Sequence, residues 1–274
     1  MMVFTFMKDR PTQDPDELSD DSLFRGRVLL HQPLRGYRFS VDAPLLVWFA
    51  CPEKPVASCA DLGAGCGVLG ISLLVARRAN RVVAVELQSR LARLAQRNAA
   101  VNNVGDRYSM IEGDILAGPD IPADGQFELV VSNPPFWPAD NGRPSPDLER
   151  QIARHETHVT LHAIADTARR LLHPTRGRFC IAYPARRLEH LLMSMSRAEL
   201  NTTRILFVHP RADTPAELVL LECRRNRSGH LRVEPPLVLK DGRNRDTEQA
   251  EFILAGGFAP EFPASTRESQ QRLE

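Results

Sequence analysis

Short apolar runs alternate with helical stretches along most of this chain, and that alternation limits the folds it can adopt. Near-continuous apolar runs are typical of strands buried on both faces of a sheet. Helical stretches between them supply the crossovers that parallel strands need. We therefore expect a parallel sheet covered by helices on both faces. The expected strands are 56–62, 81–86, 108–112, 127–132 and 178–183, and the expected helices are 67–79, 88–102, 161–172 and 186–197.

Two further strands are expected at 203–208 and 217–223. The segment HPRADTPA between them is too short for a crossover helix, so we expect these strands to pair antiparallel. The predicted fold class is α/β, with a doubly wound, mostly parallel Rossmann-like sheet and an antiparallel terminal β-hairpin.

The chain of 274 residues fits one large domain with short additions. Residues 1–22 are acidic and contain prolines, and are expected to form a flexible arm. Residues 23–255 are expected to form the domain, with an N-terminal extension of strands and turns over 23–41. Residues 256–274 are expected to form a loose C-terminal tail.

The formal net charge of +1 hides an uneven distribution. Residues 150–232 hold 15 arginines against 7 acidic residues and contain seven of the eight histidines. A basic segment of this kind is typical of proteins that bind nucleic-acid phosphates. We expect these arginines to lie on the side of the sheet that carries the active site.

The five cysteines include no C-x-x-C pair, and their neighbours are apolar or glycine. This favours buried, reduced thiols over a disulfide framework or a zinc site. The N-terminal apolar run is too short for the apolar region of a signal peptide, and no apolar run in the chain is long enough for a membrane span. We therefore expect a cytoplasmic protein that makes no contact with membranes.

A glycine-rich turn follows the first expected strand of the alternating pattern, in the sequence DLGAGCGVLG. Gly63 and Gly65 permit a tight turn and a close approach of a ligand, and Gly67 lets the next helix start against the strand. Such a turn alone is weak evidence, because dehydrogenases and other nucleotide-binding proteins also have one.

Three acidic residues at strand ends narrow the range of ligands that this turn could bind. Asp61 precedes the glycines, where it favours a ligand that carries an ammonium group over an anion. Glu86 ends the second strand, where a carboxylate can accept hydrogen bonds from ribose hydroxyls. Asp114 follows the third strand and can accept from an adenine amino group. These features fit S-adenosylmethionine, a nucleoside joined to an amino acid.

The fourth strand ends in the sequence SNPPFW. Two prolines fix an extended backbone, Asn133 and the Pro134 carbonyl offer acceptors, and Phe136 offers a ring face. Together they form a receptor for a planar group that bears an NH2. The same acceptors hold the amino nitrogen in line with a methyl donor, so catalysis depends on orientation and needs no strong base. Trp137 either packs in the core or contacts a ligand.

The motifs DLGAGCG and NPPF, with Glu86 and Asp114, resemble the class I S-adenosylmethionine-dependent N-methyltransferases. The segments GYRFSVDAPLL, ARHETHVTL, RLLHPTRGRF and ILFVHPRADTPAELVLLE resemble the bacterial valine-tRNA (tRNA1(Val)) adenine-N6 methyltransferases, which modify the adenine beside the anticodon. The resemblance covers residues 23–255 and implies a tRNA substrate and no metal. It implies that Asn133, Pro134 and Phe136 hold the base and that the stretch from Arg38 to Asp42 closes over the methionine end. The implied cofactor pocket is lined by Asp61, Gly63, Gly65, Glu86, Leu87, Asp114 and Ile115.

Several alternatives remain open. Many adenine-N6 members have NPPY, whereas NPPF also occurs in guanine-N2 methyltransferases that act on ribosomal RNA. Methylation of a glutamine amide in a release factor is a further alternative, although the basic segment favours RNA. A dehydrogenase would give NPPF no role, and an inactive RNA-binding scaffold would be expected to lack Asp61 or Asn133. His155, His158 and His162 lack the spacing of a metal site and favour a wet, partly cationic face.

Overall fold

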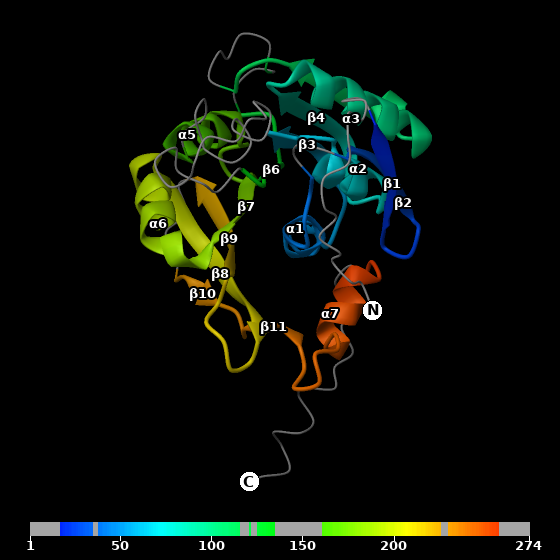
Figure 1. The fold of residues 1–274 in the computed structure, drawn as a ribbon. Helices are drawn as coiled ribbons and strands as arrows, with labels where there is room; N and C mark the ends of the chain where they lie inside the picture. The colour runs from blue at the N-terminus through cyan, green and yellow to red at the C-terminus, as the bar shows by residue number, and fades with distance from the viewer. Residues whose placement is uncertain are drawn as a thin grey trace, which may run out of the picture.

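The computed structural model describes residues 17–34, 38–115, 121, 125–134, 161–225 and 230–257. Among these residues a nine-stranded sheet has the order β10-β8-β9-β7-β6-β3-β4-β5, with β11 paired to β8 (Figure 1). Its strands are β3 (Val56–Leu62), β4 (Ala79–Glu86), β5 (Tyr108–Glu112), β6 (Leu129–Ser132), β7 (Arg178–Pro184), β8 (Leu200–Arg211), β9 (Leu218–Arg225), β10 (Arg232–Val233) and β11 (Leu237–Lys240).

The strand directions confirm the predicted fold class. Strands β5, β4, β3, β6 and β7 all run parallel to one another, because a helix-containing crossover joins most of them. Strands β8 and β9 form the expected antiparallel hairpin, and β9 lies antiparallel to β7. The chain order reverses between β3 and β6, and ligands of doubly wound sheets bind at the carboxyl ends of the strands beside such a point.

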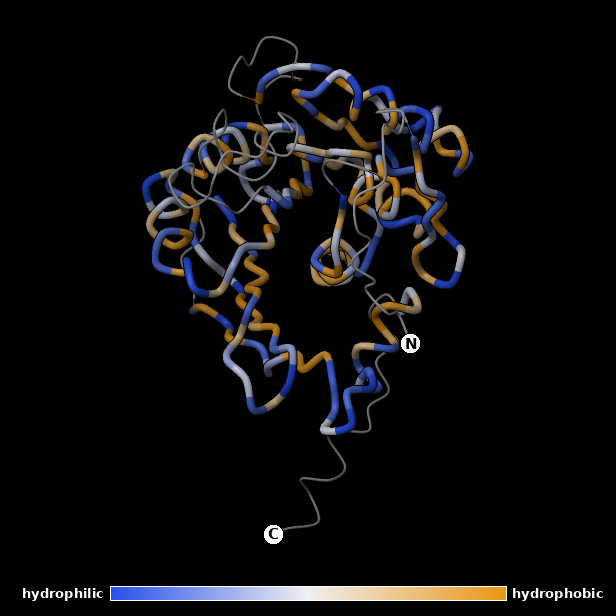
Figure 2. The backbone as a smooth tube through the Cα atoms, viewed as in Figure 1, coloured by the Kyte–Doolittle hydropathy of each residue, from blue (hydrophilic) through white to orange (hydrophobic). Residues whose placement is uncertain are grey.

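Helices cover both faces of the sheet (Figures 1 and 2). One apolar cluster joins the sheet to α1 (Asp42–Ala50), α2 (Val68–Val75) and α3 (Ser89–Val101). The other joins it to α5 (Leu161–Leu171) and α6 (Leu188–Arg197). Short 3-10 helices, η1 (Gly105–Arg107) and η3 (Ala185–Arg187), precede β5 and α6, and α7 (Glu248–Leu254) follows β11. None of the helices within the described residues is long and apolar enough to span a bilayer.

Two N-terminal strands, β1 (Leu18–Leu23) and β2 (Val28–Pro33), form a separate antiparallel pair. Strand β1 includes residues 18–22, which we expected to belong to the acidic arm, so that boundary is wrong. The acids are held in the strand by basic partners: His31 Nδ1 lies 2.6 Å from Asp20, and Arg38 lies 2.9 Å from Asp21. Residues 1–16, the rest of that arm, lie outside the described residues.

Helix α1 was not predicted from the sequence. Seven of its nine residues are buried, so its apolar side chains show no helical period that would separate it from a buried strand. Phe49 of this helix is 3% exposed and belongs to the core. All five cysteines are free and buried, which confirms that expectation.

Candidate functional site

The carboxyl ends of β3, β4, β5 and β6 lie at one edge of the sheet and bring most of the predicted site residues together. The Ser132 hydroxyl donates to the Leu62 carbonyl at 2.8 Å and ties the end of β6 to the end of β3. The Gly113 amide donates to the Glu86 carbonyl at 2.9 Å and ties the loop after β5 to β4. These contacts hold the loops that follow the strands in fixed relative positions.

The glycine-rich turn has the conformation that its sequence predicts. Gly63, Gly65 and Gly67 all have positive φ, at 73°, 57° and 88°. A Cβ on Gly67 would lie 2.8 Å from Ile71 Cδ1 in α2 and 2.9 Å from the Tyr108 hydroxyl of β5, so a glycine there lets α2 start close to the sheet. At Gly63 a Cβ would meet nothing within 4 Å. The turn therefore leaves open space above its first glycine, where a ligand can approach the backbone.

Asp61 is fully buried at the end of β3. Its Oδ2 accepts a hydrogen bond from the Gly70 amide at 2.9 Å, whereas Oδ1 has no partner among the described residues. Burial raises the pKa of this carboxyl to about 7, and the nearby Glu86 contributes to the rise. A cationic group beside Oδ1 would supply the missing partner and favour the ionised form.

The Glu86 side chain at the end of β4 forms a hydrogen bond with the glycine-rich turn. Its Oε2 accepts from the Gly65 amide at 2.8 Å, and its Oε1 accepts from the Gln88 amide at 2.9 Å. We expected this carboxylate to bind ribose hydroxyls. A carboxylate oxygen can accept more than one hydrogen bond, so the observed bonds are compatible with that prediction.

The other predicted cofactor residues lie along the same edge. Leu87 directly follows β4, and Asp114 follows β5 through Gly113. Ile115 is buried, and its carbonyl lies 3.5 Å from the hydroxyl of Thr167 on α5. Asp114 and Ile115 thus lie at the end of β5, next to the strand end that holds Glu86.

Asn133 and Pro134 follow β6 directly and are buried. Asn133 is 9% exposed, and its Oδ1 has no hydrogen-bond partner among the described residues. A buried acceptor without a partner is unfavourable, so this atom is positioned for a donor that the described residues do not supply. Phe136 and Trp137 lie outside the described residues.

The two ends of the stretch from Arg38 to Asp42 have different surroundings. The Arg38 guanidinium donates to Ser19 Oγ at 2.7 Å and to the Pro33 carbonyl at 3.1 Å, in addition to its ion pair with Asp21. Arg38 is therefore bound to the N-terminal hairpin. Asp42 begins α1 and lines a cavity, and burial raises its pKa.

Part of the basic segment serves the fold, so the expected clustering of its arginines beside the site is wrong for three of them. Arg178, Arg204 and Arg224 surround the buried Glu222, with Arg178 at 3.3 Å and Arg224 at 3.0 Å. Arg178 begins β7, at the end of the strand opposite to the carboxyl edge. A buried carboxylate needs such partners, which explains why these three arginines are half-buried around Glu222.

Other members of the segment do lie at the carboxyl edge. Arg186 and Arg187 belong to η3, which directly follows β7. The Arg187 guanidinium lies 5.3 Å from the centre of the Tyr183 ring and 3.3 Å from His190 Nδ1. These two arginines are candidates for phosphate contacts.

A metal centre was not expected, and the described residues contain no group of three His, Cys, Asp or Glu side chains that could hold an ion. His162 Nε2 lies 3.3 Å from Asp166 on the next turn of α5. His155 and His158 lie outside the described residues.

Residues 45–181 match the family described as methyltransferase small domain. A Porphyromonas gingivalis protein named tRNA1(Val) (adenine(37)-N6)-methyltransferase is 31% identical over 68% of this chain and 74% of its own length. One of the same name from Pectobacterium carotovorum is 29% identical over 71% of this chain and 76% of its own. A crystal structure of a predicted O-methyltransferase from Agrobacterium tumefaciens has a TM-score of 0.63 at 19% identity, over 80% of this chain and 97% of that chain. This last likeness concerns the fold alone.

Proposed function

The chain belongs to the methyltransferase small domain family, and from this premise we propose that it transfers a methyl group from S-adenosylmethionine to the N6 nitrogen of an adenine in tRNA. The names of its relatives specify adenine 37 of a valine tRNA. We propose the same class of substrate here, with the adenine in the anticodon loop. We also propose the cytoplasm as the compartment of the reaction.

The carboxyl edge of the sheet fits the proposed cofactor. The open space at Gly63 lets the cofactor approach the backbone of the turn. The unpartnered Oδ1 of Asp61 fits the ammonium of the cofactor's methionine part. Glu86 would accept from the ribose hydroxyls, and Asp114 would accept from the adenine amino group, with Leu87 and Ile115 beside them. When bound, S-adenosylmethionine supplies an electrophilic methyl group on its sulfonium.

The observation that carries the proposal is the buried, unpartnered Oδ1 of Asn133 at the end of β6. Strand β6 lies next to β3, whose end holds Asp61 and the glycine-rich turn. An amino group bound at Asn133 would therefore lie next to the place where the cofactor binds. The adjacent strand ends bring the site of the methyl donor and the site of the amino group that receives the methyl close together. This proximity is the main requirement of methyl transfer.

The chemistry needs orientation more than a base. Asn133 Oδ1 would accept one N–H of the adenine amino group and the Pro134 carbonyl would accept the other. These bonds draw the nitrogen lone pair out of conjugation and direct it at the methyl group. The N6 proton becomes acidic only after the transfer and leaves to solvent. Phe136 would stack on the ring of the base.

A substrate panel tests this proposal. The protein is incubated with methyl-labelled S-adenosylmethionine and one of four substrates: unmodified tRNA, tRNA without its anticodon arm, ribosomal RNA or release factor. The products are then digested and separated. Label in N6-methyladenosine that requires the anticodon arm supports the proposal. Label only in N2-methylguanosine, or only in protein, would show that the guanine or the glutamine alternative is correct.

A further inference from the structure

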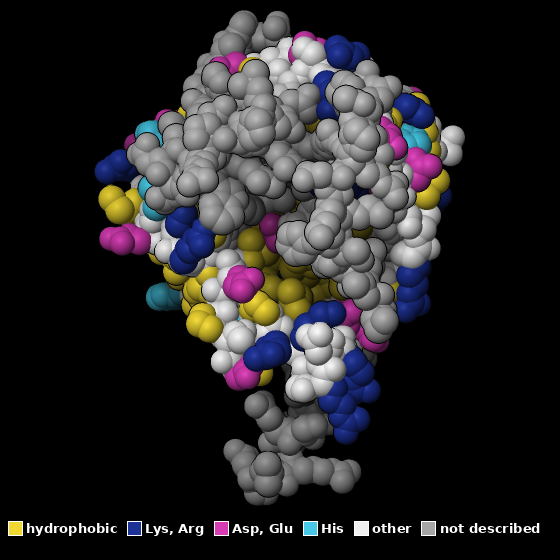
Figure 3. Space-filling view, in the orientation of Figure 1, with side chains coloured by type: hydrophobic (Ala, Val, Ile, Leu, Met, Phe, Trp, Pro, Cys, Tyr) yellow, Lys and Arg dark blue, Asp and Glu magenta, His cyan; other side chains and the backbone are white. Residues whose placement is uncertain are grey.

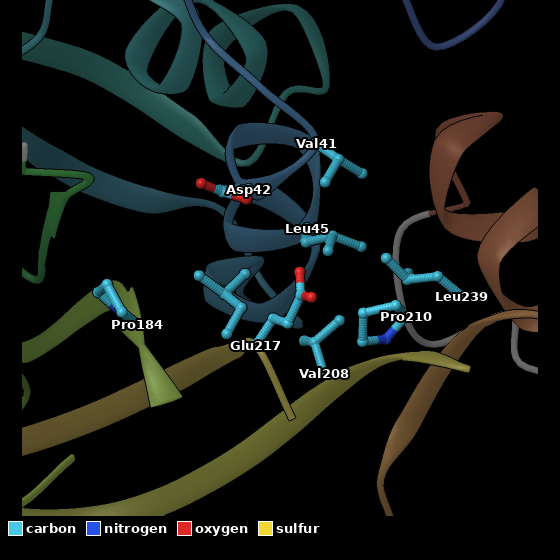
Figure 4. Close-up of a pocket in the computed structure, with 9 residues that line it drawn as sticks. Val41, Asp42, Leu45, Pro184, Val208, Pro210, Glu217 and Leu239 are labelled. Carbon is cyan, nitrogen blue, oxygen red and sulfur yellow. The ribbon is translucent and has the colours of Figure 1, made fainter. Parts of the chain in front are cut away.

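A cavity of about 200 Å³ lies between α1, the end of β7, the β8–β9 hairpin and β11 (Figure 4). Hydrophobic side chains gather in a hollow near the middle of this side of the molecule (Figure 3). Most of the cavity wall is aliphatic or proline, and two carboxylates, Asp42 and Glu217, complete it. The apolar part of the lining consists of Val41, Leu45, Pro184, Val208, Pro210, Leu218 and Leu239.

Glu217 is available to a ligand. Its backbone is used by the fold, since its carbonyl accepts from Ala185 at 2.9 Å and its amide donates to Val208 at 3.0 Å. Its side chain is exposed and shows no hydrogen bond or ion pair within the described residues. The carboxylate points toward α1, between Leu45 and Val208 (Figure 4). An acid in this position is therefore free to bind a donor that enters the cavity.

The strand register places the cavity near the methylation site. Ser132 is level with Ile181 on β7, and Leu218 on β9 is level with Pro184 at the carboxyl end of β7. Glu217 is thus two strands away from Asn133, about 10 Å across the sheet, and about 10 Å further in the direction in which β7 runs. A nucleotide that flanks the target adenine can reach this distance.

The lining determines which part of an RNA can enter. Two carboxylates repel phosphate, so the backbone of the RNA is excluded from the cavity. The apolar wall suits the face of a planar base. Carboxylates accept hydrogen bonds from base amino groups, as Glu and Asp do from the cytosine amino group. Uracil has no amino group, and its carbonyls would oppose Asp42 and Glu217.

We infer that the cavity lined by Asp42 and Glu217 binds a base that flanks the target adenine and selects one with an amino group over uracil. This assigns Asp42 to the RNA in place of the cofactor role that the family resemblance implied for it. The inference rests on the proposed function and extends it, because it makes Glu217 a residue that determines sequence preference. The volume of about 200 Å³ equals that of roughly seven water molecules at ~30 Å³ each, which is more than a single ion needs.

The experiment uses synthetic anticodon stem-loops with uracil, cytosine, adenine or guanine at each position beside the target adenine. Methyl transfer is measured with the full chain, with Glu217→Gln and with Glu53→Gln. Glu53 is an exposed glutamate before β3, at the opposite end of the sheet, and is the matched control. Cofactor affinity is measured in parallel for all three proteins by calorimetry.

With the unaltered chain and the control, uracil at one flanking position should lower kcat/KM about tenfold. With Glu217→Gln that penalty should fall below about threefold, since an amide both donates and accepts, and cofactor affinity should stay unchanged. An unaltered chain without any flanking preference, or a Glu217→Gln variant that keeps it, would overturn the inference and leave the proposed function intact. Equal losses of cofactor affinity and transfer would assign the cavity to the cofactor instead. A chain that methylates no adenine at all would overturn both.

Discussion

The side chain of Asn98 on helix α3 hydrogen-bonds both the backbone amide and the backbone carbonyl of His31 in β2. A neighbouring strand would make the same two bonds. Asn98 Oδ1 accepts from the His31 amide at 2.9 Å, and Nδ2 donates to the His31 carbonyl at 3.0 Å. The same Nδ2 donates to the Cys66 carbonyl at 2.9 Å. Since Cys66 belongs to the glycine-rich turn, one buried amide joins the N-terminal hairpin to the cofactor loop.

Asn98→Ala should lower the free energy of unfolding by about 3 kcal/mol, because it leaves buried backbone groups without partners. Asn102 provides the matched control, since it bonds both backbone groups of Leu29 in the same way but is more exposed. Asn102→Ala should cost about 1 kcal/mol. Urea denaturation measures both variants, and equal losses would contradict the role assigned to the buried amide.

The pKa of about 7 for Asp61 predicts that cofactor affinity depends on pH. The ammonium of the cofactor favours the carboxylate, so affinity should rise with pH up to about 7 and then level off. Asp61→Asn should bind much more weakly and show no such rise. Calorimetry between about pH 5.5 and about pH 8 tests this. An affinity of the unaltered chain that stays constant over that range would refute it.

Asp61 also makes the free energy of unfolding depend on pH, and this free energy falls with rising pH whereas cofactor affinity rises. Its folded pKa lies above its unfolded value of 3.8, so the fold gains most when the group is protonated. That contribution is present at low pH and is lost as pH rises from about 4 to about 7. Without cofactor, Asp61→Asn should therefore gain stability relative to the unaltered chain over this interval. Thermal unfolding at several pH values measures the difference, and a constant difference would contradict it.

The contribution of Glu222 to the free energy of unfolding should depend on pH in the opposite direction to that of Asp61. Burial alone would raise the pKa of Glu222, but Arg178, Arg204 and Arg224 lower it below its ordinary value. Glu222→Gln should therefore cost about 3 kcal/mol at neutral pH, because it leaves cations without their partner. The cost should shrink as pH falls through the folded pKa, where the native glutamate is also neutral. Denaturant unfolding tests this, with Glu53→Gln as a control expected to change little.

The buried thiols should react slowly in the native protein. Burial raises the pKa of Cys51 to about 11 and those of Cys66, Cys180 and Cys223 to about 12, and raises that of Cys59 well above its ordinary value. Thiolates are the reactive species, so few are present near neutral pH. A thiol reagent should label five cysteines only after denaturation. Fast labelling of the native chain would contradict this.

The sequence predicted the centre of the sheet well because that part obeys simple periodicity. Strand β5 occupies the predicted 108–112, and the arginine-bearing helix expected over 88–102 is α3. Asp61 and Asn133 could be found because each directly follows or ends an apolar strand, and strand ends of parallel sheets meet at one edge.

The remaining elements could not be predicted for physical reasons. Helix α1 is buried at most positions and lacks an amphipathic period. Strands β10 and β11 are short and partly exposed, and β11 is defined by its pairing with β8 far away in the chain. The cavity at Glu217 is made by four separate segments, so no local pattern marks it. The three arginines around Glu222 likewise depend on tertiary contacts.

In the proposed reaction Asn133 orients the adenine amino group for methyl transfer. The most direct measurement is the rate at which N6-methyladenosine forms in unmodified tRNA, at saturating cofactor, with the unaltered chain and with Asn133→Ala. We expect the rate to be lower by about 10²-fold or more in the variant, with cofactor affinity within about threefold of normal. Normal transfer by Asn133→Ala, or a product other than N6-methyladenosine from the unaltered chain, would contradict it.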